Sequence, residues 1–389
     1  MMKRKIESRY GLIGDNLDLK ENVSLIINQA GKILKIRYDN PKRDINLATD
    51  THNLLMIPGL INSHTHIVDS FAKEMGFNRD LTEIVAPPNG MKHSLLKNTS
   101  QDVKIKGIKN AVFEMLSNGI TFFIDFRERN IEGIHLLKDT IKNFPLDCLI
   151  LGRFTEAKEI EEILKEGDGI GFSSYNNISL HVKERLEYYK NKFQKPIACH
   201  DSEVKRDKSL LEYIINDGLI DIIVHGTHYT NDDLELIHHK KISLVLCPRS
   251  NGYFGVGFPP IADIIKLQIP ISLGTDNIMI NNTDLFEELR YLYRILRVLS
   301  RDDLTMKLDA KELLKMITIN AARNFNLEQN RGSITEGKVA DVVLIDLNDP
   351  NFYASKVDSN NIFPLIVQRT KSENIKRVYI KGELAFERN

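Results

Sequence analysis

The sequence predicts an α/β protein, a (β/α)8 TIM barrel with a small β-sandwich subdomain formed from both ends of the chain. Three observations predict this fold class. Eight short apolar runs occupy the middle of the 389 residues, an amphipathic stretch follows most of them, and both ends are rich in strand-like segments. Apolar strands that alternate with helices build a parallel sheet covered by those helices, and eight such units can close into a barrel.

The two ends of the chain share the pattern of short strands separated by turns. Residues 24–39, SLIINQAGKILKIRYD, have a β-hairpin pattern around Ala30-Gly31. Residues 339–347 and 375–387 have the same character near the other end. We therefore expect residues 1–57 and 326–389 to form one β-sandwich subdomain.

The barrel is predicted over residues 58–325, a length close to the roughly 250 residues that this fold needs. Its apolar runs are 56–66, 120–128, 146–154, 169–174, 196–203, 221–228, 242–250 and 270–276. Stretches with a hydrophobic spacing near 3.6 residues are 103–118, 131–143, 155–166, 180–193, 206–217, 230–240 and 284–299. An open, doubly wound sheet is the alternative that this pattern leaves.

The composition gives no sign of a nucleic-acid or membrane partner. Lys+Arg and Asp+Glu both number 53, so the formal net charge is zero. No apolar run approaches the roughly 20 residues of a membrane span, and no apolar segment follows the basic N-terminus as in a secretory signal. Cys148, Cys199 and Cys247 are isolated, which favours reduced thiols in a cytoplasmic protein over a catalytic cysteine. We expect a cytoplasmic protein with a small-molecule substrate.

Polar side chains that can bind a metal stand at the ends of four of the predicted strands. The first run ends in His64 and His66, which share one face because alternate residues of a strand point the same way. His200 ends the fifth run, His225 the sixth and Asp276 the eighth. Barrel active sites lie at the carboxyl ends of the strands, so we expect these side chains to meet.

The spacing of these residues agrees with a repeating β/α unit. His200 and His225 are 25 residues apart, and His225 and Asp276 are 51 apart, or one unit and two units. Glu203 follows three residues after His200. Each residue alone has an ordinary explanation as a hydrogen-bonded or solvated group at a strand end. All six together favour a site that binds a metal and transfers protons.

The segments around these positions resemble the amidohydrolase superfamily, specifically its deaminase and chlorohydrolase branch. The resemblance covers nearly the whole chain and rests on PGLINSHTH, CHDSE, VHGTHYTNDDLELI, LCPRSN and LGTDN in the barrel, and on GSITEGKVADVVLIDLN at 332–348. It implies that His64, His66, His200 and Asp276 bind one divalent metal ion. Three imidazoles and a carboxylate suit Zn(II), with Fe(II) as the alternative.

The resemblance also implies roles in catalysis. Metal coordination brings the pKa of bound water towards about 7. Asp276 would take the water proton, aided by His225, and Glu203 would protonate first the ring nitrogen and then the departing amine. Glu203 therefore favours deamination of an amino-substituted heterocycle such as a nucleobase, nucleoside or pterin. The alternatives are a cyclic amide hydrolase or chlorohydrolase with the same metal site, and a catalytically silent relative that binds a small ligand.

Three segments depart from the family pattern. The fourth run, GIGFSS, lacks the lysine or glutamate that bridges two metals in binuclear relatives, so we expect a mononuclear site. The segment SSYNNISL stands where deaminases of S-adenosylhomocysteine and methylthioadenosine carry a PHAPYT-like segment. The loop after His66, up to His93, is where we expect substrate specificity.

Three basic residues near the predicted strand ends are candidate substrate contacts. Lys73, Arg153 and Arg249 can each bind a carboxylate or phosphate group of the substrate. Ordinary rim charges that pair with nearby acids explain each of them equally well. Barrel enzymes of this kind often form homodimers, and analogy alone extends that expectation to this chain.

Overall fold

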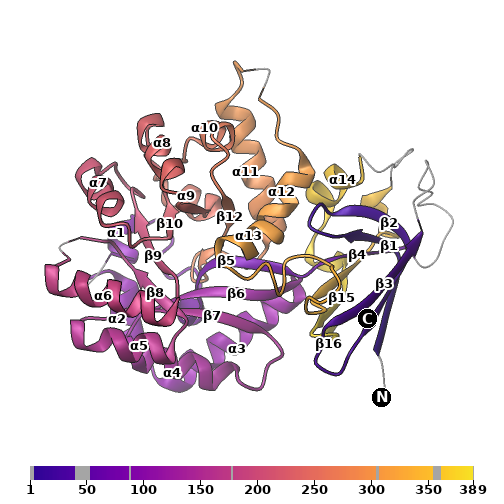
Figure 1. The fold of residues 1–389 in the computed structure, drawn as a ribbon, viewed down its shortest axis with the longest axis horizontal. Helices are drawn as coiled ribbons and strands as arrows, with labels where there is room; N and C mark the ends of the chain where they lie inside the picture. The colour runs from indigo at the N-terminus through magenta and orange to yellow at the C-terminus, as the bar shows by residue number, and fades with distance from the viewer. Residues whose placement is uncertain are drawn as a thin grey trace.

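The computed structural model of the protein describes residues 4–39, 53–86, 89–176, 178–303, 306–353 and 361–388. Its strands form two sheets, a nine-stranded parallel sheet and a seven-stranded mixed sheet. Figure 1 shows the parallel sheet with its helices on the left and the mixed sheet on the right, where indigo and yellow strands lie side by side. The two ends of the chain therefore build one layer beside the barrel, as the sequence predicts.

The nine-stranded sheet closes on itself through its eighth strand, which is split in two. In chain order its strands are β5 (Leu60–His66), β6 (Ile120–Arg127), β7 (Asp147–Gly152), β8 (Gly169–Phe172), β9 (Ile197–Asp201), β10 (Ile222–His225), β11 (Ser243–Leu246), β12 (Ile271–Leu273) and β13 (Asp276–Asn277). β12 pairs with β11, whereas β13 pairs with β5. Between the two halves, the Asn62 amide donates to Thr275 Oγ1 at 2.8 Å and accepts from the Thr275 N–H at 3.1 Å. These two bonds join β5 to the last strand.

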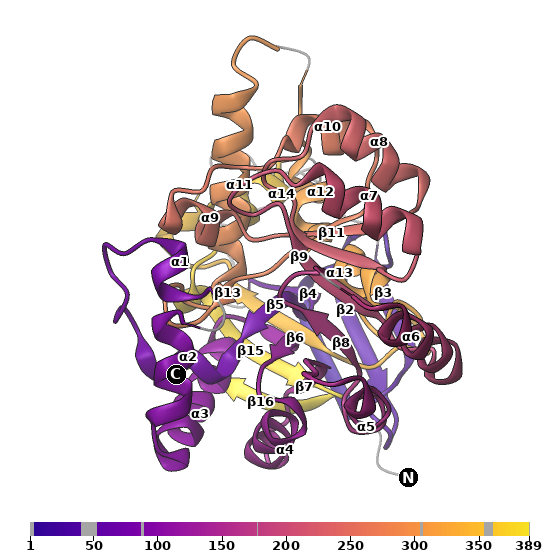
Figure 2. The same ribbon diagram turned by 90° about the vertical axis from the view of Figure 1, so that its left-hand side faces the viewer.

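Amphipathic helices cover the outside of the barrel (Figures 1 and 2). They are α3 (Gln101–Ser117), α4 (Asn130–Ile141), α5 (Ile160–Glu166), α6 (Leu180–Phe193), α7 (Lys208–Asp217), α8 (Asn231–His239), α10 (Ile261–Lys266) and α11 (Leu285–Leu299). Side chains at the first positions accept backbone N–H groups, as Asp207 does for α7, Thr230 for α8 and Asp284 for α11. None of the described helices is both long enough and apolar enough to cross a membrane.

Apolar side chains fill the amino-terminal half of the barrel interior. Ile61, Phe122 and Val224 belong to this buried cluster, and helix α13 (Ile319–Asn324) closes it from below with Ala321, Ala322 and the following Phe325. The Arg331 guanidinium lies over the Phe122 ring, 4.1 Å from its centroid. This half of the barrel is a packed core, so a ligand can enter only from the other end.

The seven-stranded sheet joins both terminal segments. Its strands are β1 (Arg4–Ile13), β2 (Asp18–Ile27), β3 (Ile33–Asp39), β4 (Leu54–Pro58), β14 (Val342–Asp346), β15 (Ile375–Ile380) and β16 (Glu383–Glu387). Their order is β16-β15-β14-β4-β1-β2-β3, with the antiparallel pair β14 and β4 connecting the two ends of the chain. The sheet folds back on itself, because the Ile33 N–H donates to the Lys338 carbonyl at 2.9 Å. It thereby encloses an apolar core of its own.

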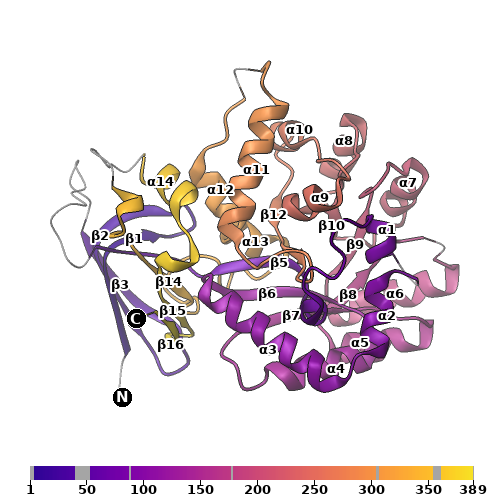
Figure 3. The same cartoon turned by 180° about the vertical axis from the view of Figure 1, so that it is seen from behind.

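The second terminal segment contains a helix that the strand-rich pattern did not predict. Helix α14 (Ile362–Arg369) packs against α11 and α12 (Ala310–Met316), and Figure 3 shows it between the barrel and the mixed sheet. Arg290 of α11 donates to the carbonyl of Thr370 at 2.7 Å, just after α14. Of the predicted subdomain, residues 1–3, 40–52, 354–360 and 389 lie outside the described part of the chain.

Candidate metal centre

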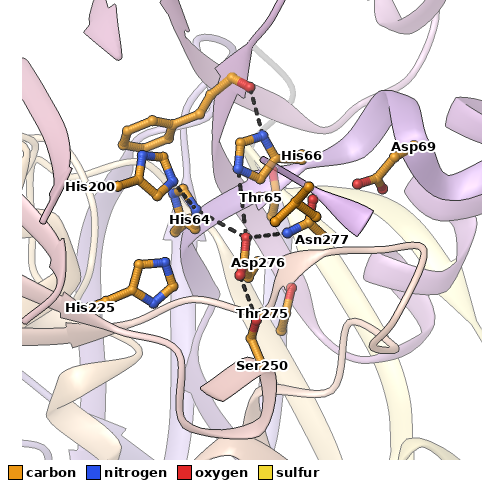
Figure 4. Close-up of polar contacts among 12 residues, drawn as sticks. His64, Thr65, His66, Asp69, His200, His225, Ser250, Thr275, Asp276 and Asn277 are labelled. Atoms are coloured by element: carbon orange, nitrogen blue, oxygen red, sulfur yellow. Dashed lines mark hydrogen bonds and ion pairs between the residues drawn. The ribbon is translucent and has the colours of Figure 1, made fainter. Parts of the chain in front are cut away.

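Four side chains from three strands meet at the carboxyl end of the barrel, as Figure 4 shows. His64 and His66 come from β5, His200 from β9 and Asp276 from β13. His64 Nε2 lies 3.3 Å and His66 Nε2 lies 3.6 Å from Asp276 Oδ1. His200 Nε2 lies 3.2 Å from His64 Nε2. Each nitrogen and the carboxylate oxygen therefore face one common point inside the barrel.

Hydrogen bonds on the far side of two rings fix which nitrogen faces this point. His200 Nδ1 donates to the carbonyl of Phe172 at 2.7 Å, and His66 Nδ1 donates to the carbonyl of Phe126 at 3.1 Å. Because a carbonyl only accepts, Nδ1 carries the proton and Nε2 presents its lone pair to the centre. Burial lowers the pKa of His200 well below its usual range, and burial with the nearby Lys92 lowers the pKa of His66 to about 3. Both rings are neutral.

This set of atoms fits a divalent cation. His64, His66 and His200 hold their ligand atoms within 4.8 Å of one another, and so do His64, His225 and Asp276. Lone pairs that face one another and a carboxylate oxygen repel unless a cation lies between them. Imidazole nitrogens with a carboxylate are the ligands that Zn(II) takes in catalytic sites. The residues present therefore can hold a metal ion.

Two neighbours orient the Asp276 carboxylate. Ser250 Oγ donates to Oδ2 at 2.5 Å, and Asn277 Nδ2 donates to Oδ1 at 2.9 Å. Burial raises the pKa of Asp276, but its contact with His64 and the nearby histidines hold the pKa well below the usual range. Asp276 has a φ of 61° and His225 a φ of 73°, in the left-handed region that few non-glycine residues adopt. Such strain clusters at functional sites.

His225 and Glu203 face each other beside the four donors. His225 Nε2 lies 3.5 Å from Glu203 Oε1. On its other side, His225 Nδ1 donates to Asn251 Oδ1 at 3.0 Å, and the Asn251 amide is held by a 2.9 Å bond to Thr227 Oγ1. Burial raises the pKa of Glu203, although the nearby His225 opposes this. A carboxyl group with a raised pKa keeps its proton more readily and can act as an acid.

A cavity of about 270 Å³ opens directly onto these groups. Its lining includes His66, His200, Glu203, His225 and Asp276. The loop that follows His66 supplies another part of the wall, through the short helices α1 (Leu81–Ile84) and α2 (Met91–Asn98). The lining residues from this loop are Leu81, Thr82, Val85, Ala86, Lys92 and His93.

Comparison with known proteins decides which family this architecture represents. Residues 55–170 and 175–385 match the sequence profile of the amidohydrolase family. The chain belongs to the amidohydrolase family. The match confirms the predicted family and its class, hydrolases that act on carbon–nitrogen bonds.

Individual relatives of this amidohydrolase match it over most of their length. An uncharacterized protein of Methanocaldococcus jannaschii is 34% identical over 84% of this chain and 88% of its own. A 5-methylthioadenosine/S-adenosylhomocysteine deaminase of Thermoanaerobacter pseudethanolicus is 27% identical over 95% of this chain and 90% of its own. The crystal structure of an adenosine deaminase from Xanthomonas campestris with bound zinc covers 98% of this chain and 92% of its own, with a TM-score of 0.78 and 19% identity. This last likeness confirms the predicted fold.

Arg153 is the predicted substrate contact that the amidohydrolase structure brings to the cavity. It is half-buried in the cavity wall near Ser173. Its Nε atom donates to the carbonyl of Gly171 at 3.5 Å, and the described contacts contain no carboxylate within 4 Å of its guanidinium. An arginine without an acidic partner beside a cavity is able to bind an anionic group of a ligand.

Lys73 and Arg249, the other two predicted contacts, are paired with acids. Lys73 Nζ lies 2.5 Å from Glu114 Oε2, with half of the lysine side chain exposed. Arg249 is buried and donates to Glu288 Oε1 at 2.8 Å and to Glu287 Oε2 at 2.7 Å. Neither is among the described residues that line the cavity. The structure therefore places both as paired charges outside the amidohydrolase cavity.

Sequence reasoning did not predict two residues that contact the proposed metal ligands, Glu128 and Asn277, or Lys92, which contacts both of them. Glu128 Oε1 lies 2.9 Å from His66 Nδ1, so it shares the Nδ1 proton with the Phe126 carbonyl, and the Lys92 ammonium lies 2.7 Å from the same oxygen. Asn277 contacts Asp276, as described above. A signal for Glu128 exists, because it ends the second apolar run at the same rim as the histidines. The sequence presents Lys92 only as one of several basic residues of the first loop that can bind an anionic group of the substrate, and it gives no sign that Lys92 contacts Glu128 and Asn277.

Proposed function

We propose that this amidohydrolase is a mononuclear zinc aminohydrolase that releases ammonia from an amino-substituted heterocycle such as a nucleobase, nucleoside or pterin. The observation that carries the proposal is Glu203, a carboxyl group with a raised pKa in the wall of the cavity, beside His225 and the four donors. An amine leaves a ring carbon only with an added proton, and Glu203 is in position to give it.

His64, His66, His200 and Asp276 would hold the zinc ion. Bound there, a divalent metal supplies a strong nucleophile at neutral pH by lowering the pKa of a water molecule. A single ion is proposed because β8, with the sequence GIGF, has no lysine or glutamate to bridge a second one. The zinc in the adenosine deaminase of Xanthomonas campestris supports this choice of metal.

The residues of the chain divide the proton transfers between them. The Asp276 carboxylate takes a proton from the attacking water, with His225 Nε2 next to it. The carboxyl group of Glu203 protonates the ring nitrogen adjacent to the attacked carbon. The proton that Asp276 took then passes to the amino group, and the hydroxyl group on the attacked carbon gives its proton to Glu203. The carbon–nitrogen bond breaks, neutral ammonia leaves, the ring carbon keeps the oxygen of water, and both carboxyl groups return to their starting state. Proton transfers of this kind contribute roughly 10²–10⁴-fold each.

Arg153 is proposed to contact a carboxylate or phosphate group of the substrate. Its position in the cavity wall and its lack of a described acidic partner support this role. The likeness to a deaminase of methylthioadenosine and S-adenosylhomocysteine supports a purine ring as the reacting part. The cavity volume of about 270 Å³ suits a small heterocyclic ligand.

A screen for ammonia tests the proposed function. Zinc-loaded protein is incubated with adenine, guanine and cytosine derivatives and with pterins, and ammonia is measured by a coupled assay. We expect ammonia from at least one compound class, and a Glu203→Gln protein with full zinc content should release none. Opening of a lactam or release of chloride without ammonia would instead identify a cyclic amide hydrolase or a chlorohydrolase. Ligand binding without any turnover would identify a silent relative.

A further inference from the structure

We propose that Lys92 is a positioning residue that holds two of the proposed metal ligands at once. Its ammonium group, carried by α2, contacts Glu128 behind His66 and Asn277 beside Asp276. The inference rests on the metal site of the proposed function. It concerns a residue from the first loop, outside the strands that carry the donors.

The first arm of this bridge runs to His66. The Lys92 ammonium lies 2.7 Å from Glu128 Oε1, and the same oxygen lies 2.9 Å from His66 Nδ1. Arg127 contacts the other oxygen of Glu128, so both oxygens of this carboxylate are held by cations. A carboxylate behind a metal-binding histidine fixes the ring orientation and the nitrogen that carries the proton. Lys92 thus acts on His66 through the position of Glu128.

The second arm runs to Asp276 on the neighbouring strand. Lys92 Nζ donates to Asn277 Oδ1 at 2.8 Å. Because the amide oxygen of Asn277 faces the ammonium, its Nδ2 atom must face the other way, where it donates to Asp276 Oδ1 at 2.9 Å. With the ammonium removed, Asn277 Oδ1 loses this donor, and the amide is no longer held with its Nδ2 atom directed at the carboxylate. Lys92 thus fixes the direction of the bond that orients Asp276.

Burial restricts the Lys92 ammonium to a position where its charge is paired. Lys92 is 3% exposed, and Glu128, Asn277 and the nearby Asp69 are buried as well. A charge in such surroundings has to be paired, because leaving it unpaired costs much free energy. Lys92 Nζ also lies 3.6 Å from Asp69 Oδ2, an ion pair that is too long for a hydrogen bond. Glu128 just after β6, Asn277 on β13 and Asp69 on the 3-10 helix Ile67–Ala72 therefore surround the Lys92 ammonium, and the first two accept its hydrogen bonds.

The bridge also ties the cavity wall to the metal centre. Lys92 precedes His93, whose Nε2 atom donates to the carbonyl of Val85 at 3.0 Å and so holds the two short helices of the loop together. Lys92, His93 and Val85 all line the cavity. Lys92 thus connects the loop that forms the cavity wall to the proposed metal ligands His66 and Asp276.

Replacement of Lys92 by methionine tests the inference without a substrate. The purified full-length protein is titrated with Zn(II) in competition with a chromophoric chelator. We expect Lys92→Met to raise the dissociation constant of zinc about ten- to hundredfold. Lys104→Met is the matched control. Lys104 is also buried and donates a hydrogen bond to the carbonyl of Leu96 in α2 at 2.9 Å, but its described contacts include none of the four proposed metal ligands. It should leave zinc affinity unchanged, and Lys92→Arg should restore most of it.

The outcomes separate this inference from the proposed function. A folded Lys92→Met protein with the zinc affinity of the wild type, or an equal loss in Lys104→Met, would overturn the inference. If Lys92→Met does not fold, Glu128→Gln and Asn277→Ala each cut one arm, and unchanged zinc affinity in both has the same meaning. A protein that binds zinc through Lys92 as expected but deaminates nothing contradicts only the proposed function.

Discussion

The two ends of the barrel interior are filled with opposite kinds of side chain. At the amino-terminal end, Phe122, Ala322 and Phe325 belong to an apolar cluster closed by α13. At the carboxyl end, the strands of the barrel finish in histidines and acids, of which His64 and Asp276 are just as buried and His200 is partly exposed. Burial of apolar surface stabilises the fold wherever volumes match. Burial of polar groups does so only when each group finds its partner.

The carboxyl end carries costs that the amino-terminal end lacks. His64 Nδ1 and Asp201 Oδ1 are buried without a hydrogen-bond partner among the described residues. His225 and Asp276 have a left-handed backbone, which costs of order 1–3 kcal/mol each. The packed core below offsets these costs. The amino-terminal end of the barrel therefore supplies stability, and the carboxyl end carries the candidate metal centre. Substitutions at the first end should lower the free energy of unfolding, and substitutions at the second should lower zinc affinity or turnover.

Loss of a metal donor should give the largest effect and leave the fold in place. His200→Ala removes one of the four donors, so we expect zinc to be lost and ammonia release to fall below detection. The apolar end is untouched, so the far-ultraviolet circular dichroism should match the wild type. Elemental analysis of the purified variant measures the metal. One zinc per chain together with normal turnover would show that His200 is no ligand.

Loss of the proposed acid should give the next largest effect. Glu203→Gln keeps the shape of the side chain but cannot donate a carboxyl proton, so kcat should fall roughly 10²–10⁴-fold. Zinc content should stay at the wild-type level, because Glu203 is not one of the four donors. Steady-state kinetics and elemental analysis on the same sample check both statements. An unchanged kcat would remove the main support for deamination.

A cavity at the apolar end should act on stability alone. Phe325→Ala removes a buried ring below the barrel and should lower the free energy of unfolding by about 3–5 kcal/mol. The kcat of the folded fraction and its zinc affinity should not change, since the donors lie at the opposite end. Urea unfolding and zinc competition measure the two quantities separately. A parallel loss of zinc affinity would mean that the two ends are coupled.

The smallest effect is expected at Arg153, on binding of the substrate. Arg153→Met removes a charged contact worth about 1.5–3 kcal/mol, so KM for an anionic substrate should rise about tenfold or more while kcat stays similar. Arg249→Met provides the contrast, because it leaves the buried Glu288 without its cation and should lower stability instead. Steady-state kinetics and urea unfolding of both variants distinguish the two arginines. Equal changes in KM would contradict this division.

Local patterns were sufficient to predict the barrel and the residues at its rim. Each strand is a short apolar run, and the carboxyl ends of parallel strands meet at one rim whatever lies between them. That rule brings His64, His200 and Asp276 together from positions more than 200 residues apart. The split of the eighth strand into β12 and β13 did not follow from its sequence, because it depends on pairing with β11 on one side and β5 on the other.

The partners of charged side chains could not be predicted in the same way. Lys92 and Asn277 are 185 residues apart, and Arg249 and Glu288 are 39 residues apart on different elements. No regular sequence spacing relates the two members of such a pair, because their contact depends on how a loop or helix packs on the finished barrel. The same limit explains why Lys73, Arg153 and Arg249 looked equivalent in the sequence although only Arg153 lines the cavity.

The mixed sheet also has a consequence for the way the chain is made. Strand β4 finds its partner β14 only after the whole barrel has been synthesised between them. At roughly 5–20 residues per second, that delay is on the order of 15–60 seconds, during which β4 presents an unpaired edge. A nascent chain with such an edge is a natural client for chaperones. In a circular permutant that joined the two ends, both halves of the sheet would leave the ribosome together.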